Sequence, residues 1–356
     1  MEGKMRTLEY FYEHSLTKHT FLPRKVDITL ASKILLTGPK FCGKYSIIQS
    51  FLQSHFDQKE LLFINFDDVR SQSIAYDEIE PFIEKNSIKA VVLYGIKKPF
   101  SLPNAPYLII ISHNNVEIDG FMHYHLSNLD FEEYLLFEKR ADIKVIFNNF
   151  LKNGNYPELS KIADFKKDKY FQELLFLTFK EDFQIFKEIA FYQGYTTSIY
   201  FLFNRIKERH KISKDRFYTL FESWQRDRYI YAVEKYNAKR AAKKLFFHDF
   251  TIKSRLFTQK EFPKIFENMV FLEITHKEVF YIEPLGFYIP SEELLILSIP
   301  FGNEARIQEK IDHVLTKNHI AIKKIEVVTV GSSFTYYIKN IQCEILPFYA
   351  WAVGKE

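Results

Sequence analysis

Apolar runs and helical patterns alternate through the first 130 residues of the chain. Four runs are apolar at consecutive positions and end at polar residues or glycine, so we predict buried strands over residues 34–37, 61–66, 89–94 and 107–112. Apolar positions recur at helical spacing in three other segments, which predicts helices over residues 8–15, 46–56 and 76–85. Buried strands that alternate with helices are typical of a parallel sheet covered on both faces, so this part of the chain predicts an α/β domain.

A helical region follows this α/β pattern. Asp130 is the expected N-cap of a helix that begins at Phe131, and a second helix is predicted over 143–151. Three helices without intervening strands are then predicted over residues 171–192, 198–210 and 213–226, the last with Ser213 as its N-cap. Residues 228–233 and 244–247 are predicted to form a hairpin. Three helices and a hairpin predict a winged helix-turn-helix.

The pattern becomes mixed again after residue 250. We predict helices over 262–275 and 304–317, and strands over residues 279–282, 294–299 and 325–330. A nuclease of the restriction-enzyme type would need acidic residues and a lysine on two of these strands, but Leu297-Ser298-Ile299-Pro300 supplies none. Glu267 alone cannot make a metal site, so we predict an α/β domain without metal-dependent chemistry.

The loop after the first predicted strand carries the most informative motif of the chain, and it reads Gly38-Pro39-Lys40-Phe41-Cys42-Gly43-Lys44-Tyr45-Ser46. Glycines in a loop between a strand and a helix let backbone N–H groups surround a phosphate, and a lysine then reaches the outer phosphates. We therefore predict that these nine residues bind the phosphates of a nucleotide, with Lys44 on the β- and γ-phosphates. The alternative is a tight turn that only closes the strand.

The groups that would hydrolyse a nucleotide are replaced. Tyr45 stands where a P-loop has the Ser or Thr that holds Mg²⁺, and Ser46 comes one residue late. The strand that should end in an acidic pair ends in Tyr94 and Gly95. We therefore assign no catalytic residue and no metal ligand, and we expect ATP or ADP as the ligand while leaving Mg²⁺ open.

Other polar residues follow the predicted strands of the first domain. Asp67 and Asp68 end one strand, and they either reach the phosphate site or cap a turn. Residues 112–115, Ser-His-Asn-Asn, end the next strand, where a polar side chain either senses a terminal phosphate or belongs to a simple polar loop.

Positive charge is concentrated in one stretch. The chain has a formal net charge of +4, but residues 205–244 contain 13 Lys and Arg against 5 Asp and Glu. This stretch overlaps the predicted winged helix, so DNA contact is expected there. The alternative is a protein docking or dimer surface. The candidate contact residues are Arg209, Lys211, Lys214, Arg216, Lys239 and Arg240.

Two cysteines, Cys42 and Cys343, provide neither a disulfide framework nor a metal cluster, which fits a reducing compartment. The first residues lack the apolar core of a signal peptide, and no run approaches the length of a membrane span. We therefore expect a cytoplasmic protein with no membrane partner.

In the order of its motifs the chain resembles the AAA-like predicted ATPases of bacteria and archaea, which join a P-loop module to a winged helix and a C-terminal restriction-nuclease-like domain. The segments that correspond to motifs of that family span nearly the whole chain: residues 38–45, 65–68, 93–96, 126–134, 154–158, 266–268, 328–329 and 347–351. The departures are Tyr45, Tyr94 and Gly95, together with Phe121 after Gly120 where the family often has arginine, and the missing C-terminal acidic motif.

The resemblance implies ATP binding and hydrolysis by an AAA-like module. Of these two activities, we expect the binding in this chain. The expected domains are a P-loop domain over 1–168 with a small helical lid at about 129–168, a winged helix over 169–249, and a nuclease-like α/β domain over 250–356. The leading hypothesis is a P-loop protein that binds ATP or ADP with hydrolysis weak or absent. The second is a DNA-binding or regulatory protein that uses the P-loop module as a scaffold, and the third is a protein-docking adaptor.

Overall fold

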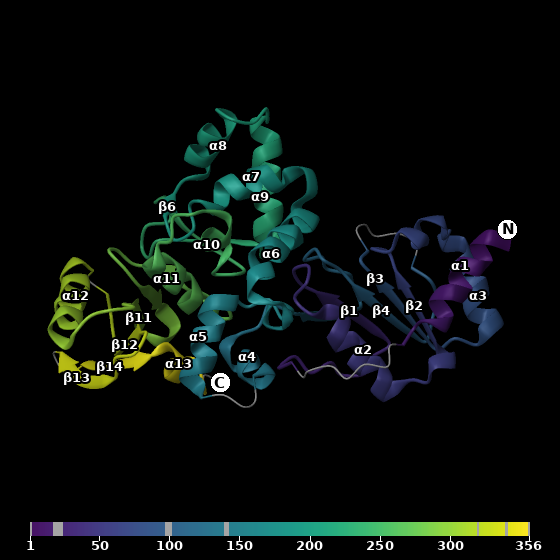
Figure 1. The fold of residues 1–356 in the computed structure, drawn as a ribbon, viewed down its shortest axis with the longest axis horizontal. Helices are drawn as coiled ribbons and strands as arrows, with labels where there is room; N and C mark the ends of the chain where they lie inside the picture. The colour runs from purple at the N-terminus through teal and green to yellow at the C-terminus, as the bar shows by residue number, and fades with distance from the viewer. Residues whose placement is uncertain are drawn as a thin grey trace. The chain divides into compact units, whose positions relative to one another are not determined.

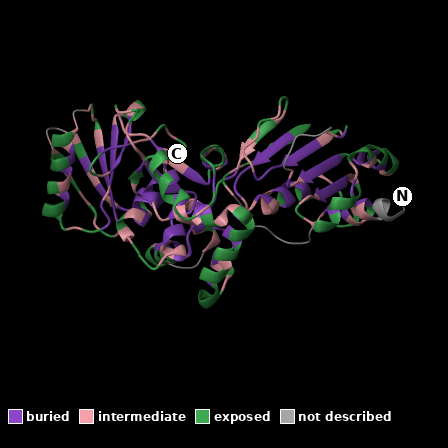
Figure 2. Cartoon of the chain, turned by 90° about the horizontal axis from the view of Figure 1, so that it is seen from above, coloured by how far each residue is buried: buried purple, intermediate pink, exposed green. Residues whose placement is uncertain are grey.

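The computed structural model describes residues 2–16, 24–96, 102–138, 142–318, 320–338 and 341–354. The chain divides into two compact units, Met1–Asn128 and Leu129–Glu356 (Figure 1). Buried residues follow the strands of both units (Figure 2). Among the described residues, no helix combines the length and the apolar character that crossing a membrane would require.

The first unit is built on a five-stranded parallel sheet in the order β2-β3-β4-β1-β5. Its strands are β1 (Lys33–Thr37), β2 (Leu61–Asn65), β3 (Ala90–Tyr94), β4 (Tyr107–Ile111) and β5 (Met122–His125). The four strands predicted from apolar runs are confirmed. The fifth, β5, was not predicted because its sequence, Met-His-Tyr-His, is not an apolar run.

Helices cover both faces of this sheet, as predicted. On one face, α2 (Lys44–His55) packs Ile48 and Leu52 against Ile34 and Leu36 of β1. On the other face, Leu35 of β1 belongs to the core that receives α1 (Glu2–Glu13) and α3 (Ile79–Asn86). Because side chains alternate along β1, one strand contributes to both cores. Short 3-10 helices lie over Gln58–Glu60, Val69–Ser73 and Tyr76–Glu78.

The second unit contains a six-stranded mixed sheet in the order β13-β14-β12-β11-β10-β9. Its strands are β9 (Phe280–Tyr281), β10 (Phe287–Ile289), β11 (Leu294–Ser298), β12 (Lys324–Thr329), β13 (Phe334–Ile338) and β14 (Ile341–Pro347). On one face, Leu295 and Leu297 pack with α12 (Glu304–Lys317). On the other, Ile296 shares a core with α11 (Phe262–Leu272) and α13 (Phe348–Trp351), so this sheet is also covered on both faces.

Two helices that the sequence assigned to the first domain pack inside the second unit. They are α4 (Phe131–Phe137), capped by Asp130 as predicted, and α5 (Ile143–Asn153). The ring of Phe348 lies 5.5 Å from the rings of both Phe131 and Phe147, centroid to centroid. Residues 129–168, expected as a lid on the P-loop domain, therefore lie in the second unit, because their aromatic side chains fill its core. The predicted boundaries at 168/169 and 249/250 stay predictions.

The predicted helices and hairpin of the second unit are present with two differences. The helix expected over 171–192 is divided at Lys180, whose φ is 50°, into α6 (Asp164–Phe179) and α7 (Phe183–Ala190), with a short 3-10 helix at Lys180–Asp182. A short strand, β6 (Thr196–Thr197), joins the hairpin in a sheet of order β6-β8-β7. The remaining elements are α8 (Ile199–Lys207), α9 (Lys214–Arg226), β7 (Ile230–Val233), β8 (Lys243–Phe247), α10 (Ile252–Leu256) and two 3-10 helices, Leu159–Lys161 and Pro290–Glu292. Ser213 caps α9 as predicted, because its hydroxyl accepts a hydrogen bond from Arg216 N.

A buried polar network joins the turn after α5 to the segment after β8. The Tyr156 hydroxyl lies 2.6 Å from Nε2 of His248, and the Asn155 amide donates to the His248 carbonyl at 3.1 Å. Nδ1 of His248 lies 3.1 Å from the Tyr229 carbonyl, so a neutral ring donates there and accepts from Tyr156. Burial lowers the pKa of His248 to about 4. The Asn-Tyr-Pro-Glu segment thus has a structural role in the second unit.

His248 predicts a pH-dependent stability of the second unit. In the unfolded chain a histidine titrates near 6.5, so between about pH 6.5 and pH 4 the unfolded state binds a proton that the folded state does not. The free energy of unfolding should therefore fall by roughly 3 kcal/mol as the pH decreases through that window. Urea unfolding followed by tryptophan fluorescence measures this unit alone, because both tryptophans, Trp224 and Trp351, lie in it.

The control is His248→Gln, which removes the titrating group. This variant should be less stable at neutral pH, but its stability should change less between pH 6.5 and pH 4. An equal pH dependence in the variant and the natural protein would contradict the assignment.

Candidate functional site

The loop that links β1 to α2 has the backbone conformation of an anion-binding turn. Gly38 has φ of 148°, Phe41 has φ of 62° and Gly43, the residue before α2, has φ of 101°. Left-handed angles turn successive N–H groups toward one side of a loop. A side chain at residue 38 would also place its Cβ 2.1 Å from the Leu126 carbonyl oxygen, so glycine is required there.

Backbone N–H groups of this loop are not used by the protein itself. Within the described part of the chain, the N–H groups of Phe41, Cys42, Gly43 and Lys44 make no hydrogen bond. Four consecutive donors at the N-terminus of a 12-residue helix, with the positive end of its dipole behind them, favour an anion. This arrangement can bind phosphate oxygens.

Lys44 is almost fully buried, with 2% of its surface exposed. Its ammonium group donates to the carbonyls of Gly38 at 2.6 Å and Pro39 at 2.5 Å, and lies 3.8 Å from the Cys42 sulfur. Burial lowers the pKa of Lys44, and its interactions with Cys42 and Asp67 oppose that effect. The two carbonyls and the Cys42 sulfur take the three hydrogens of this ammonium group, so a phosphate would have to replace one of these contacts.

Other contacts fix the loop from outside. The Arg24 guanidinium donates to the Cys42 carbonyl at 2.6 Å and to the Ser127 carbonyl at 2.9 Å. The Cys42 thiol donates to the Leu126 carbonyl at 3.3 Å. The loop is therefore tied to the segment after β5, which the sequence did not indicate because that strand was not predicted.

Aromatic side chains pack together between the start of α2 and the strands β2 and β3. The Tyr45 ring packs edge-on against Phe63 of β2, 5.7 Å between centroids, and against Tyr94 of β3 at 6.1 Å. Tyr94 in turn meets the ring of His113 at 5.4 Å. Tyr45 is thus part of the core between α2 and the sheet.

Asp67 and Asp68, which the sequence could not tell apart, have different surroundings. Oδ2 of Asp67 lies 2.5 Å from Nε2 of His113, and its Oδ1 lies 4.0 Å from the ammonium group of Lys40. Asp68 instead caps the 3-10 helix at Val69–Ser73 and binds the side chain of Arg70, which lowers the pKa of Asp68 to about 2. Asp67 is brought to the loop, and Asp68 has the capping role.

His113 connects the end of β4 to this group. Its burial lowers the pKa of His113, the hydrogen bond to Asp67 opposes that shift, and the charges of Lys44 and Lys40 lower it further. A neutral ring therefore donates its Nε2 hydrogen to Asp67. Within residues 112–115, it is thus His113 that interacts with the charges of Lys40 and Lys44.

Within the part of the chain that the structure describes, the side chains near the loop do not form a Mg²⁺ cage by themselves. Among the described residues, no three His, Cys, Asp or Glu side chains come together as metal ligands. The position after Lys44 carries a phenol packed in the core, and one oxygen of Asp67 is already hydrogen-bonded to His113. Mg²⁺ at a nucleotide site keeps several waters and is held by one or two carboxylates together with phosphate oxygens, so Asp67 alone does not form a cage for it.

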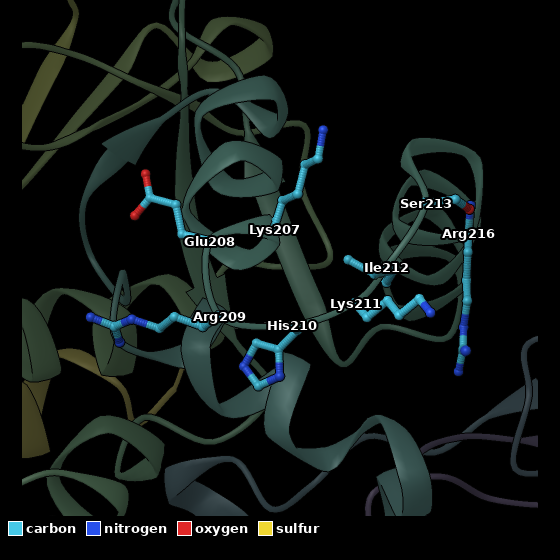
Figure 3. Close-up of a pocket in the computed structure, with 8 residues that line it drawn as sticks. All are labelled: Lys207, Glu208, Arg209, His210, Lys211, Ile212, Ser213 and Arg216. Carbon is cyan, nitrogen blue, oxygen red and sulfur yellow. The ribbon is translucent and has the colours of Figure 1, made fainter.

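The candidate DNA-contact residues lie in the second unit, and their surroundings differ. Lys211 lines a surface hollow of about 700 Å³ at the turn between α8 and α9 (Figure 3). Arg209 and Arg216 line it too, but Arg209 pairs with Glu188 at 3.1 Å and Arg216 with Asp182 at 2.7 Å. Lys214 lies over the ring of Tyr218, and the hairpin residues Lys239 and Arg240 are exposed.

The C-terminal sheet contains carboxylates that the sequence did not single out. Glu326 of β12 and Glu344 of β14 are paired in register, and Lys324 bridges them at 3.0 and 2.8 Å. Glu326 also accepts from the indole of Trp351 at 2.7 Å. Glu267 is bound to Lys244 at 2.5 Å. These carboxylates are neutralised by lysines, which is the pattern of structural ion pairs.

No family model matches the chain, and no curated protein matches its sequence. Among solved structures, the chain is similar to the Walker-type ATPase PABY2304 of Pyrococcus abyssi. The identity is 14%, the TM-score is 0.42, and the match covers 72% of this chain and 95% of that one. A likeness this distant carries no conclusion about chemistry.

Gly38→Ala should destabilise the first unit. Both the positive φ and the 2.1 Å approach to the Leu126 carbonyl oppose a side chain, so we expect a loss of about 2 to 4 kcal/mol. Amide hydrogen exchange in β1 and β4 measures this unit directly.

Gly120→Ala is the matched control. Gly120 also has positive φ, 79°, but a Cβ there meets nothing within 4 Å, so the expected loss is about 1 kcal/mol. Equal losses in the two variants would show that the packing of residue 38 on Leu126 is unimportant.

Proposed function

We propose that this chain is an AAA-like P-loop protein that binds ATP or ADP through residues 38–46 and hydrolyses it slowly or not at all. The observation that carries the proposal is the set of unused backbone N–H groups at residues 41–44, at the start of α2, together with a buried lysine whose ammonium group is bound to the loop carbonyls. In a protein, N–H groups that lack an internal acceptor need water or a ligand, and phosphate satisfies several at once.

The expectation of slow hydrolysis follows from what surrounds the loop. Transfer of a phosphoryl group requires a metal ion that bridges the outer phosphates and a group that orients the attacking water. Tyr45 and Tyr94 pack against each other at the positions concerned, and Gly95 has no side chain. Phosphate binding and phosphate transfer depend on different residues, so the first persists without the second.

Lys44→Ala should abolish the stabilisation of the first unit by nucleotide. Binding at a hundredfold excess over the dissociation constant stabilises a folded protein by about 2.7 kcal/mol, so ADP should protect the β1 amides of the natural protein from hydrogen exchange. The variant should show no such protection, and phosphate release from ATP with Mg²⁺ should be equally slow in both proteins.

Lys44→Ala also removes the hydrogen bonds to the loop carbonyls, so its stability without nucleotide must be compared first. Ser54→Ala, in the last turn of α2 and away from the loop, is the control that should retain protection by ADP. Equal protection in Lys44→Ala and the natural protein would remove the assignment, and turnover like that of an ordinary ATPase would remove the expectation of slow hydrolysis.

A second candidate function is duplex DNA binding by the helices and hairpin of the second unit. The order α7-β6-α8-α9-β7-β8 supports a winged helix followed by a nuclease-like α/β domain that lacks metal-dependent chemistry. In a winged helix, the last helix enters the major groove while the hairpin contacts phosphates. The specific observation in favour is that Lys211, Lys239 and Arg240 are exposed, with no ion pair found for them among the described residues.

Replacing Lys211, Lys239 and Arg240 by Gln should weaken duplex DNA binding about tenfold or more at 50 mM salt. Each lost phosphate contact also reduces the slope of log affinity against log salt by about 0.9, so the slope should become shallower. Fluorescence anisotropy of a labelled duplex between 50 and 200 mM salt gives both quantities.

The control is the triple replacement of Lys166, Lys260 and Lys317, which are exposed and change the net charge equally. An equal loss in the control would indicate non-specific attraction, and an absence of binding at 50 mM salt would dismiss DNA as a partner in favour of a protein-docking surface.

A further inference from the structure

Asp67 occupies the place that a side chain on the end of β3 would need. A Cβ at Gly95 would lie 3.0 Å from the Asp67 carboxyl carbon and 3.1 Å from Oδ2. The residue that follows β3 therefore has no side chain, and the carboxylate beside it comes from the segment that follows β2. The site has one carboxylate here, delivered by a neighbouring strand.

The Asp67 carboxylate is held in a defined orientation by its neighbours. His113 holds Oδ2 at 2.5 Å, which leaves Oδ1 directed at the ammonium group of Lys40 at 4.0 Å. Asp67 is also close enough to the buried Lys44 for their charges to interact. Its side chain keeps 32% of its surface exposed, so solvent and small ions reach it.

A phosphate chain in the loop would meet this charge at its outer end. In the proposed site Lys44 reaches the β- and γ-phosphates, and the charge of Asp67 interacts with Lys44, so a third phosphate would lie near Asp67 and Lys40. A triphosphate carries more negative charge than a diphosphate, and it must also draw Lys40 away from Asp67. Both effects act against the third phosphate when no cation is present to screen them.

We propose that Asp67, oriented by His113, is a specificity-determining residue that makes the loop prefer a diphosphate to a triphosphate in the absence of divalent cations. The inference rests on the proposed nucleotide site and adds to it a choice between ligands. His113 is a positioning residue in this arrangement, because it acts through Asp67.

Isothermal titration calorimetry of the full chain with ADP and with ATP, both in EDTA, tests the proposal. For the natural protein we expect ADP to bind about five- to tenfold more tightly than ATP, which is the effect of one additional charge near Asp67 at an intermediate dielectric constant. In Asp67→Asn the two affinities should come within about twofold, because ATP binds more tightly.

Asp68→Asn is the matched control, since Asp68 has the same side chain one residue later and is bound to Arg70. It should retain the preference of the natural protein. Asp67→Ser, which is smaller and uncharged, should behave like Asp67→Asn and provides a second variant if the first does not fold.

The outcomes separate this inference from the proposed function. Binding of both nucleotides with a ratio that Asp67→Asn and Asp67→Ser leave unchanged would overturn the role of Asp67 alone. A natural protein that binds ATP as tightly as ADP in EDTA would do the same. A flat titration with both nucleotides would overturn the nucleotide site itself.

Discussion

The phosphate-loop assignment depends on the hydrogen bonds between the Lys44 ammonium group and the carbonyls of Gly38 and Pro39. A buried ammonium group without partners would be costly, and these carbonyls satisfy it inside the loop. The same contacts hold the ammonium group of Lys44 against the start of the loop. The lysine thus maintains the loop before any ligand arrives, and a ligand would take over one of its contacts.

Next to this loop, aromatic side chains stand at positions where a P-loop enzyme has polar or acidic ones. Tyr45, Phe63 and Tyr94 form a continuous set of ring contacts between α2 and the sheet. Ring contacts of this kind stabilise a core and contribute nothing to a developing negative charge. The ionisable side chains Asp67 and His113 lie beside these rings, in the segments that follow β2 and β4. The proposed slow hydrolysis rests on this arrangement.

Much of the fold could be predicted from the sequence, because it depends on local patterns. Apolar runs located β1 to β4, and the glycines and lysine located the loop. The pattern did not reveal β5, since Met122–His125 is largely polar, or the break in the helix at Lys180, which is a left-handed residue without a glycine signal. The pairing of Asp67 with His113 could not be predicted either. Each residue was noted at a strand end, but their meeting depends on the spatial order β2-β3-β4, which is a property of the sheet.

The placement of residues 129–168 changes where the chain can be divided. These residues directly follow the first unit in sequence, yet Phe131, Phe147 and Phe150 lie against the C-terminal helix α13. Evolutionary exchange of the first unit for another would leave the rest intact if the junction fell near residue 128. A junction near residue 168 would instead remove aromatic side chains that pack in the core of the C-terminal sheet. Recombination between relatives of this chain should therefore be tolerated near residue 128 and selected against near residue 168.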